Sequence, residues 1–232
     1  LAIYKKERDN LQNEEANQAT LVEVCKEKAQ AQLKVLLEVR LRLKAAGIDI
    51  NNQRQQAQSE ITALISNTQA PVDYDTNSDT ISAIKLRLQV QLQLCFTIKQ
   101  KLNSAQTQLQ NLQNAKKTQD ALKQQAIVDA LQNRYNAEWQ IALHIKLLLQ
   151  IQIRIQVLLR SEGQSTGDDS EIDTLEEEIL PSDNAPKAQW IALLKMKFDI
   201  ELKLLVFLSQ SYTAQTALVQ AMKNGGLNTK DE

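Results

Sequence analysis

The sequence has few of the residues that interrupt regular secondary structure. Its 232 residues include only five glycines and three prolines, and aromatic residues make up 4%. Tight turns depend on glycine and proline, so their scarcity argues against a sandwich or small barrel with many short strands. The hydrophobic fraction of 43% and charged fraction of 24% are typical of a folded chain. We therefore expect a few long regular elements around a sizeable core.

Cysteine and histidine are also scarce, which limits disulfide, metal and acid–base chemistry. Cys25 and Cys95 could form one disulfide in a secreted protein, or be small core residues in a cytosolic one. No CxxC pair or Cys/His cluster occurs, so a structural zinc site is excluded. The single histidine, His144, has no recognisable serine or cysteine partner, and we expect it at the surface rather than as a catalytic base.

Motifs for cofactors and nucleic acids are missing as well. Gly47 is the only glycine before residue 163, which leaves no place for a glycine-rich phosphate loop. The acidic stretch DDSEIDTLEEE lacks the central glycine and spacing of a calcium-binding EF-hand loop. No nucleic-acid recognition motif is found. These absences predict a protein without enzymatic activity, cofactor, metal site or specific nucleic-acid partner.

The sequence also lacks a long uninterrupted apolar run. Every leucine-rich stretch carries Lys, Arg, Gln or Glu, and we therefore expect no transmembrane segment. The chain begins at Leu1 without methionine or a basic-then-apolar leader. This start favours a processed chain, and we expect a secreted protein.

What the sequence does have is a strict alternation of apolar and polar residues in four runs. They cover residues 33–43, 84–98, 139–159 and 190–208. The last two runs align with Trp139 on Trp190, which indicates an internal repeat of about 50 residues. A period of two is typical of a strand, because successive side chains point to opposite faces of a sheet.

Between these runs the apolar spacing changes to that of a helix. Residues 99–137 predict a long amphipathic helix, and shorter helices are expected near residues 22–29, 50–68 and 211–223. We therefore predict an α+β fold, with four long amphipathic strands in one sheet and long helices covering its apolar face. In the predicted domain organisation, three helix–strand repeats span residues 1–160 and an acidic flexible linker spans 161–186. The fourth strand and C-terminal helix, residues 187–232, would pack with 1–160 as a single domain.

The alternative is an all-α protein with long helices in a coiled-coil-like bundle. Heptad spacing can be drawn through the same runs, and it explains three apolar residues that the strand pattern misplaces, Leu36, Leu148 and Leu205. We prefer strands because four runs of unbroken alternation are harder to obtain by chance than loose heptads in a leucine-rich chain.

Charge is distributed unevenly along the chain. Residues 161–186 contain nine acidic residues and no Lys or Arg, so the rest of the chain, with 27 basic and 19 acidic residues, has a net charge of +8. Such a segment is typical of an exposed linker. We predict that basic residues on the polar sheet face bind an anion or a partner: Lys34, Arg40, Arg42, Lys85, Arg87, Lys146, Arg154, Lys195 and Lys197.

These patterns predict a non-enzymatic structural or interaction protein that acts through a long polar and basic sheet face, modulated by the acidic segment. The expected partners are another protein or a second copy, or an anionic polymer or lipid. The alternative function is a carrier of lipids or other amphiphiles, or an interface-active protein whose helices swing off an apolar surface.

Overall fold

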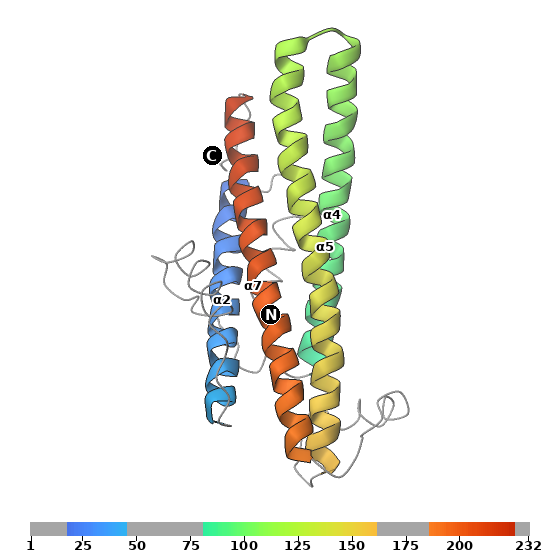
Figure 1. Cartoon of the computed structure of the whole chain (residues 1–232). Helices are drawn as coiled ribbons and strands as arrows, with labels where there is room; N and C mark the ends of the chain where they lie inside the picture. The colour runs from blue at the N-terminus through green and yellow to red at the C-terminus, as the bar shows by residue number, and fades with distance from the viewer. Residues whose placement is uncertain (1–17, 46–80, 162–185, 226–232) are drawn as a thin grey trace.

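The fold is all-helical in the part of the chain that the structure describes. The computed structural model in Figure 1 describes residues 18–45, 81–161 and 186–225. They form the helices α2 (Gln18–Ala45), α4 (Ile81–Asn114), α5 (Thr118–Ser161) and α7 (Pro186–Asn224). None of these residues lies in a strand, so the predicted α+β fold with a four-stranded sheet is wrong and the all-α alternative is correct.

The four helices form an elongated up-down-up-down bundle (Figure 1). In sequence order each helix runs antiparallel to the one before it, and α7 packs against both α2 and α5, while α5 packs against α4. The 44 residues of α5 would extend over roughly 66 Å at 1.5 Å per residue. At its turn, the hairpin of α4 and α5 projects beyond the start of α2 and the end of α7 (Figure 1).

The alternating runs are helical, and burial along them follows the helix rather than alternating. In α4, Gln91 is fully buried whereas Leu92 is 44% exposed, the reverse of what a strand would give. In α5, Gln152 and Ile153 are both buried. Each helical residue turns by about 100°, so an alternating pattern distributes apolar side chains around the whole circumference.

The main core lies where the heptad spacing placed it. Leu36, Leu148 and Leu205, which the strand pattern could not explain, are all buried in one cluster that draws on all four helices. A second cluster lies within the α4–α5 hairpin and joins Leu102 and Leu109 of α4 to residues of α5 and to Leu218 of α7. Apolar burial of this kind stabilises long helices more than their intrinsic propensity does.

The α4–α5 connection is a tight helix C-cap. Lys116 has a φ of 57°, the left-handed conformation that usually requires glycine. The Lys117 amide donates to the Leu112 carbonyl and the Lys116 amide to the Gln113 carbonyl, both at 3.0 Å. This hydrogen-bond pattern is a Schellman motif. At the other end of the bundle α7 begins with Pro186, which suits the first helical position because proline has no amide hydrogen to leave unbonded.

Two sequence-based predictions lie outside the described residues. They are the short helix near residues 50–68 and, apart from its end residues, the acidic segment 161–186.

One observation bears on the prediction that no segment spans a membrane. Within the described residues, Thr118–Leu158 is long and apolar enough to cross a membrane, by length and composition only. Its most apolar window is 67% buried inside the bundle, and the core helix of a bundle passes the same test, so this segment carries no argument for a membrane span.

Candidate functional site

A cluster of buried polar residues crosses the core of the bundle around Glu138 of α5. Lys28 Nζ of α2 lies 4.0 Å from Glu138 Oε2, and Arg134 Nε lies 3.7 Å from Oε1. Gln91 of α4 donates to Oε2 at 2.6 Å, and Ser211 of α7 donates to Oε1. These five residues, called the Glu138 network below, come from all four helices and are all buried.

The network holds Glu138 as a carboxylate. Burial alone would raise the pKa of Glu138, but the positive charges of Lys28 and Arg134 and the hydrogen bonds from Gln91 and Ser211 together lower it below its ordinary value. On α4, the pKa of Lys101 is lowered by burial and then by the charge of Arg134. The core therefore contains opposite charges that stabilise one another in place of water.

Further buried hydrogen bonds extend the network along α7 and α2. Arg134 Nη1 donates to Gln215 Oε1 at 2.5 Å, and Gln215 Nε2 donates to the Gln18 carbonyl at 3.0 Å. Each of these bonds joins different helices, the first α5 to α7 and the second α7 to α2.

Both cysteines lie beside the network as buried thiols, with no disulfide between them. Cys25 Sγ is 3.8 Å from Ser211 Oγ, and Gln91 Nε2 is 3.9 Å from Cys95 Sγ. Of the two possibilities that the sequence left open, the structure shows small core residues.

A second polar group lies further along the bundle. Gln32 of α2 donates to the Glu201 carbonyl of α7 at 2.9 Å and also to its carboxylate. Arg87 Nη2 of α4 donates to Gln32 Oε1 at 3.4 Å. Lys197, predicted on an exposed basic face, is only 1% exposed and donates to Gln152 Oε1 at 3.2 Å.

The other predicted basic residues do not share a face, because there is no sheet to align them. They are distributed over four helices: Lys34, Lys146, Arg154 and Lys195 are exposed, and Lys85 and Arg87 are half-buried. The side chains of Arg40 and Arg42 lie outside the described part of the structure. Of this set, the structure places Arg87 and Lys197 in the polar core.

His144 is buried rather than at the surface. Its Nδ1 donates to the Gln140 carbonyl at 2.7 Å, and its ring centroid is 5.1 Å from that of Phe207. The expectation of a surface histidine is wrong because its place in the alternating pattern does not determine its place on the helix.

Five of the exposed large apolar side chains on α4 and α5 are called the α4–α5 stripe below: Leu92, Phe96, Trp139, Leu143 and Leu147. Within each helix they are four residues apart, which places them on one face. The bond from Gln91 Nε2 to the Glu138 carbonyl, 2.9 Å long, joins the residues immediately before Leu92 and Trp139. The two parts of the stripe therefore lie at the same level of the bundle. The alternating pattern had placed all five residues in the core; their spacing of four was the signal that could have revealed the stripe.

The charged residues near the stripe are basic. There is no Asp or Glu in α4, and none in α5 after Glu138. Lys99 is exposed with its Nζ 4.9 Å from the centroid of the Tyr135 ring, and Lys146 and Arg154 are exposed on α5. The stripe is thus an apolar surface flanked only by positive charge within these two stretches.

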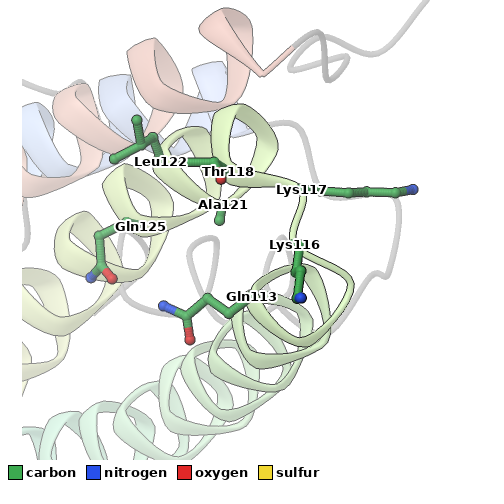
Figure 2. Close-up of a pocket in the computed structure, with 7 residues that line it drawn as sticks. All are labelled: Gln113, Lys116, Lys117, Thr118, Ala121, Leu122 and Gln125. Atoms are coloured by element: carbon green, nitrogen blue, oxygen red, sulfur yellow. The ribbon is translucent and has the colours of Figure 1, made fainter.

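Two open hollows lie elsewhere on the described surface. One, of about 300 Å³, is at the α4–α5 turn, where Gln113, Ala121 and Gln125 surround it and Lys117 extends away from them (Figure 2). The other, of about 580 Å³, lies between α5 and α7 and is lined by small, amide and hydroxyl residues without a charge: Asn133, Asn136, Ala137, Gln140, Val206, Ser209, Gln210, Thr213, Ala214 and Ala217. Neither is lined by a residue of the Glu138 network. The described residues contain no group of three or more His, Cys, Asp or Glu that could hold a metal ion.

Comparison with protein-family models, with curated proteins and with solved structures found no match for this chain.

Proposed function

We propose that this is a non-enzymatic, interface-active protein that binds anionic lipid surfaces through the α4–α5 stripe. One observation supports this proposal above the others: large apolar side chains are exposed together on two adjacent helices, and the charged residues of α4, and of α5 after Glu138, are all positive. Exposed apolar patches are typical of binding sites. The basic surroundings make an anionic amphiphile the best chemical match.

The apolar residues of the stripe are suited to the boundary between water and lipid. Phe96 is 65% exposed and Trp139 45% exposed, so both would lose contact with water on binding. Removing apolar surface from water contributes about 25 cal/mol per Å². Tryptophan favours such a boundary because its ring is apolar and its N–H remains available to polar groups.

The basic residues would add electrostatic attraction. A lysine or arginine near an anionic lipid surface contributes about 1 kcal/mol, and the effect weakens as salt is added. Lys99, Lys146 and Arg154 are exposed and long enough to place their charge at lipid headgroups while their stems cover apolar surface.

The placement of the titratable groups supports a non-enzymatic role. Lys28, Arg134 and Glu138 form a cluster of ionisable groups, and all three are buried in the core. They do not line either hollow, whereas a catalytic group has to reach its substrate.

The experiment compares binding of the full chain to vesicles of phosphatidylcholine alone and of phosphatidylcholine with phosphatidylglycerol. Sedimentation with the vesicles and a blue shift of tryptophan fluorescence both report binding. The variant Leu92→Gln/Phe96→Gln is expected to lose binding at least tenfold. Leu122→Gln is the matched control, because Leu122 is also exposed, at 62%, but lies at the α4–α5 turn.

A charge variant tests the second half of the proposal. Lys99→Glu/Lys146→Glu should weaken binding to the anionic vesicles about tenfold or more at low salt, and by less at high salt. Lys223→Glu, at the exposed end of α7, should have little effect. Equal binding to both kinds of vesicle, or a stripe variant that binds as well as the wild type, would contradict the proposal. Concentration-dependent dimerisation that Phe96→Gln abolishes, without vesicle binding, would show instead that the stripe binds a second copy.

A further inference from the structure

The four helices are not joined equally around the bundle. The backbones of α4 and α5, of α5 and α7, and of α2 and α7 pack closely, but those of α2 and α4 do not approach in the same way within the described residues. Side chains bridge this α2–α4 seam instead. Leu21 of α2 packs with Leu94 and Ile98 of α4, and Arg87 donates to Gln32.

The Glu138 network also closes this seam. Lys28 of α2 and Gln91 of α4 both contact the same atom, Glu138 Oε2, at 4.0 and 2.6 Å. Separating α2 from α4 must therefore break at least one contact with this carboxylate. It also lets water reach side chains that are fully buried in the closed bundle.

We propose that the bundle opens along the α2–α4 seam and that the Glu138 network is the latch that holds the seam closed. This inference rests on the proposed function, since an opened bundle lays its apolar core on the lipid. In water, opening is opposed because it exposes apolar surface. When the bundle opens on a membrane, lipid covers the exposed apolar side chains in place of water, while the charges of the network regain the hydration that burial removes.

The chain contains its own reporters of opening. Cys25 on α2 and Cys95 on α4 are buried thiols, not joined in a disulfide, on the two sides of the seam, and each lies within 4 Å of a residue of the network. A closed seam protects both thiols from a maleimide, because alkylation needs access to the sulfur. The rate of alkylation of each cysteine, measured in solution by peptide mass spectrometry, therefore measures opening.

The latch is tested by comparing alkylation by N-ethylmaleimide in variants of the full chain. Glu138→Gln leaves two buried cations without their carboxylate and should accelerate alkylation of both cysteines on the order of 100-fold. Ser211→Ala removes the hydrogen bond to Glu138 and also the contact with Cys25, so it is judged by Cys95, whose alkylation should accelerate about tenfold. It serves as the test if Glu138→Gln does not fold. Asp129→Asn is the control, since Asp129 is an exposed carboxylate on the same helix.

An apolar replacement tests the latch in the opposite direction. In Lys28→Met/Arg134→Met/Glu138→Leu the charges are removed together, so both alkylation and the rate of association with anionic vesicles should be slower than in the wild type. In Ser211→Ala both rates should rise together. Alkylation rates that do not respond to Glu138→Gln or Ser211→Ala would overturn the latch even if the protein binds vesicles. A protein that does not bind vesicles would overturn the proposed function, and the alkylation rates in solution would still test the latch.

Discussion

At the scale of single residues, the structure contains two departures from ordinary preference. Ionised side chains lie in the core, where an unpaired charge is costly and a paired one contributes little net stability. Lys116 adopts a left-handed backbone conformation that costs a non-glycine residue about 1–2 kcal/mol. The ionised core side chains are surrounded by hydrogen bonds and opposite charges from four helices, whereas the conformation of Lys116 reflects the geometry of the α4–α5 turn alone.

Lys116→Gly is expected to stabilise the protein by about 0.5–1 kcal/mol, because glycine adopts the left-handed conformation without strain. Denaturation with urea, followed by circular dichroism, measures the change. The matched control is Lys117→Gly. Among non-glycine residues of the described chain only Lys116 has a positive φ, so a glycine at position 117 should destabilise by adding freedom to the unfolded chain. Stabilisation by both variants would contradict the explanation.

At the scale of the element, α4 shows how a two-residue alternation can exist on a helix. Leu94, Ile98 and Leu102 lie on the buried side at helical spacing, while Leu92 and Phe96 form the exposed stripe. The polar residues between them follow no common rule, since Gln91 is buried and Gln93 is exposed. Only the neighbouring helices determine which of the alternating side chains meet water.

Substitutions to glutamine along α4 should therefore follow helical rather than strand geometry. Leu94→Gln, at a position that is 2% exposed, should destabilise by roughly 3 kcal/mol, because it leaves a cavity and buries an amide without a partner. Leu92→Gln should change stability by less than about 0.5 kcal/mol, as is usual for surface positions. The free energy of unfolding in urea distinguishes them. Similar large losses for both variants would be the result expected of a strand.

At the scale of the whole molecule, the Glu138 network couples all four helices to one carboxylate. Its pKa is lowered in the folded protein by Lys28, Arg134 and the hydrogen bonds, which outweigh burial. A group whose folded pKa is lowered contributes stability above its unfolded pKa, near 4.3, and that contribution is lost as pH falls through the folded pKa. The bundle should therefore be destabilised by acid as one cooperative unit.

The expected result is a difference in stability between wild type and Glu138→Gln of about 3 kcal/mol or more at pH 7, which shrinks as pH falls below 4. Thermal unfolding across pH 3–7 measures it. If Glu138→Gln does not fold, Ser211→Ala replaces it. Loss of this hydrogen bond raises the folded pKa of Glu138, so the acid transition should begin at higher pH than in the wild type. A difference that stays constant from pH 7 to pH 3 would show that Glu138 is not the carboxylate responsible.

The sequence by itself determined that the elements are few and long, and where one of them begins. Few glycines and prolines led to few, long elements, and Pro186 marks the start of α7. Heptad spacing located Leu36, Leu148 and Leu205 in the core. The same runs also satisfied the pattern of a strand, because leucine and glutamine in alternation fit a two-residue period and a loose helical one alike.

The tertiary structure decided between these two patterns and created the sites. A helix can bury alternating residues only when several neighbours surround it, and α5 has such neighbours in α4 and α7. The burial of Glu138 requires cations and donors that lie up to 110 positions away along the chain, at Lys28 and Ser211. The α4–α5 stripe is exposed for the complementary reason, since the other helices of the described bundle pack against the opposite side. No local spacing contains this information, because it depends on which faces of distant helices meet.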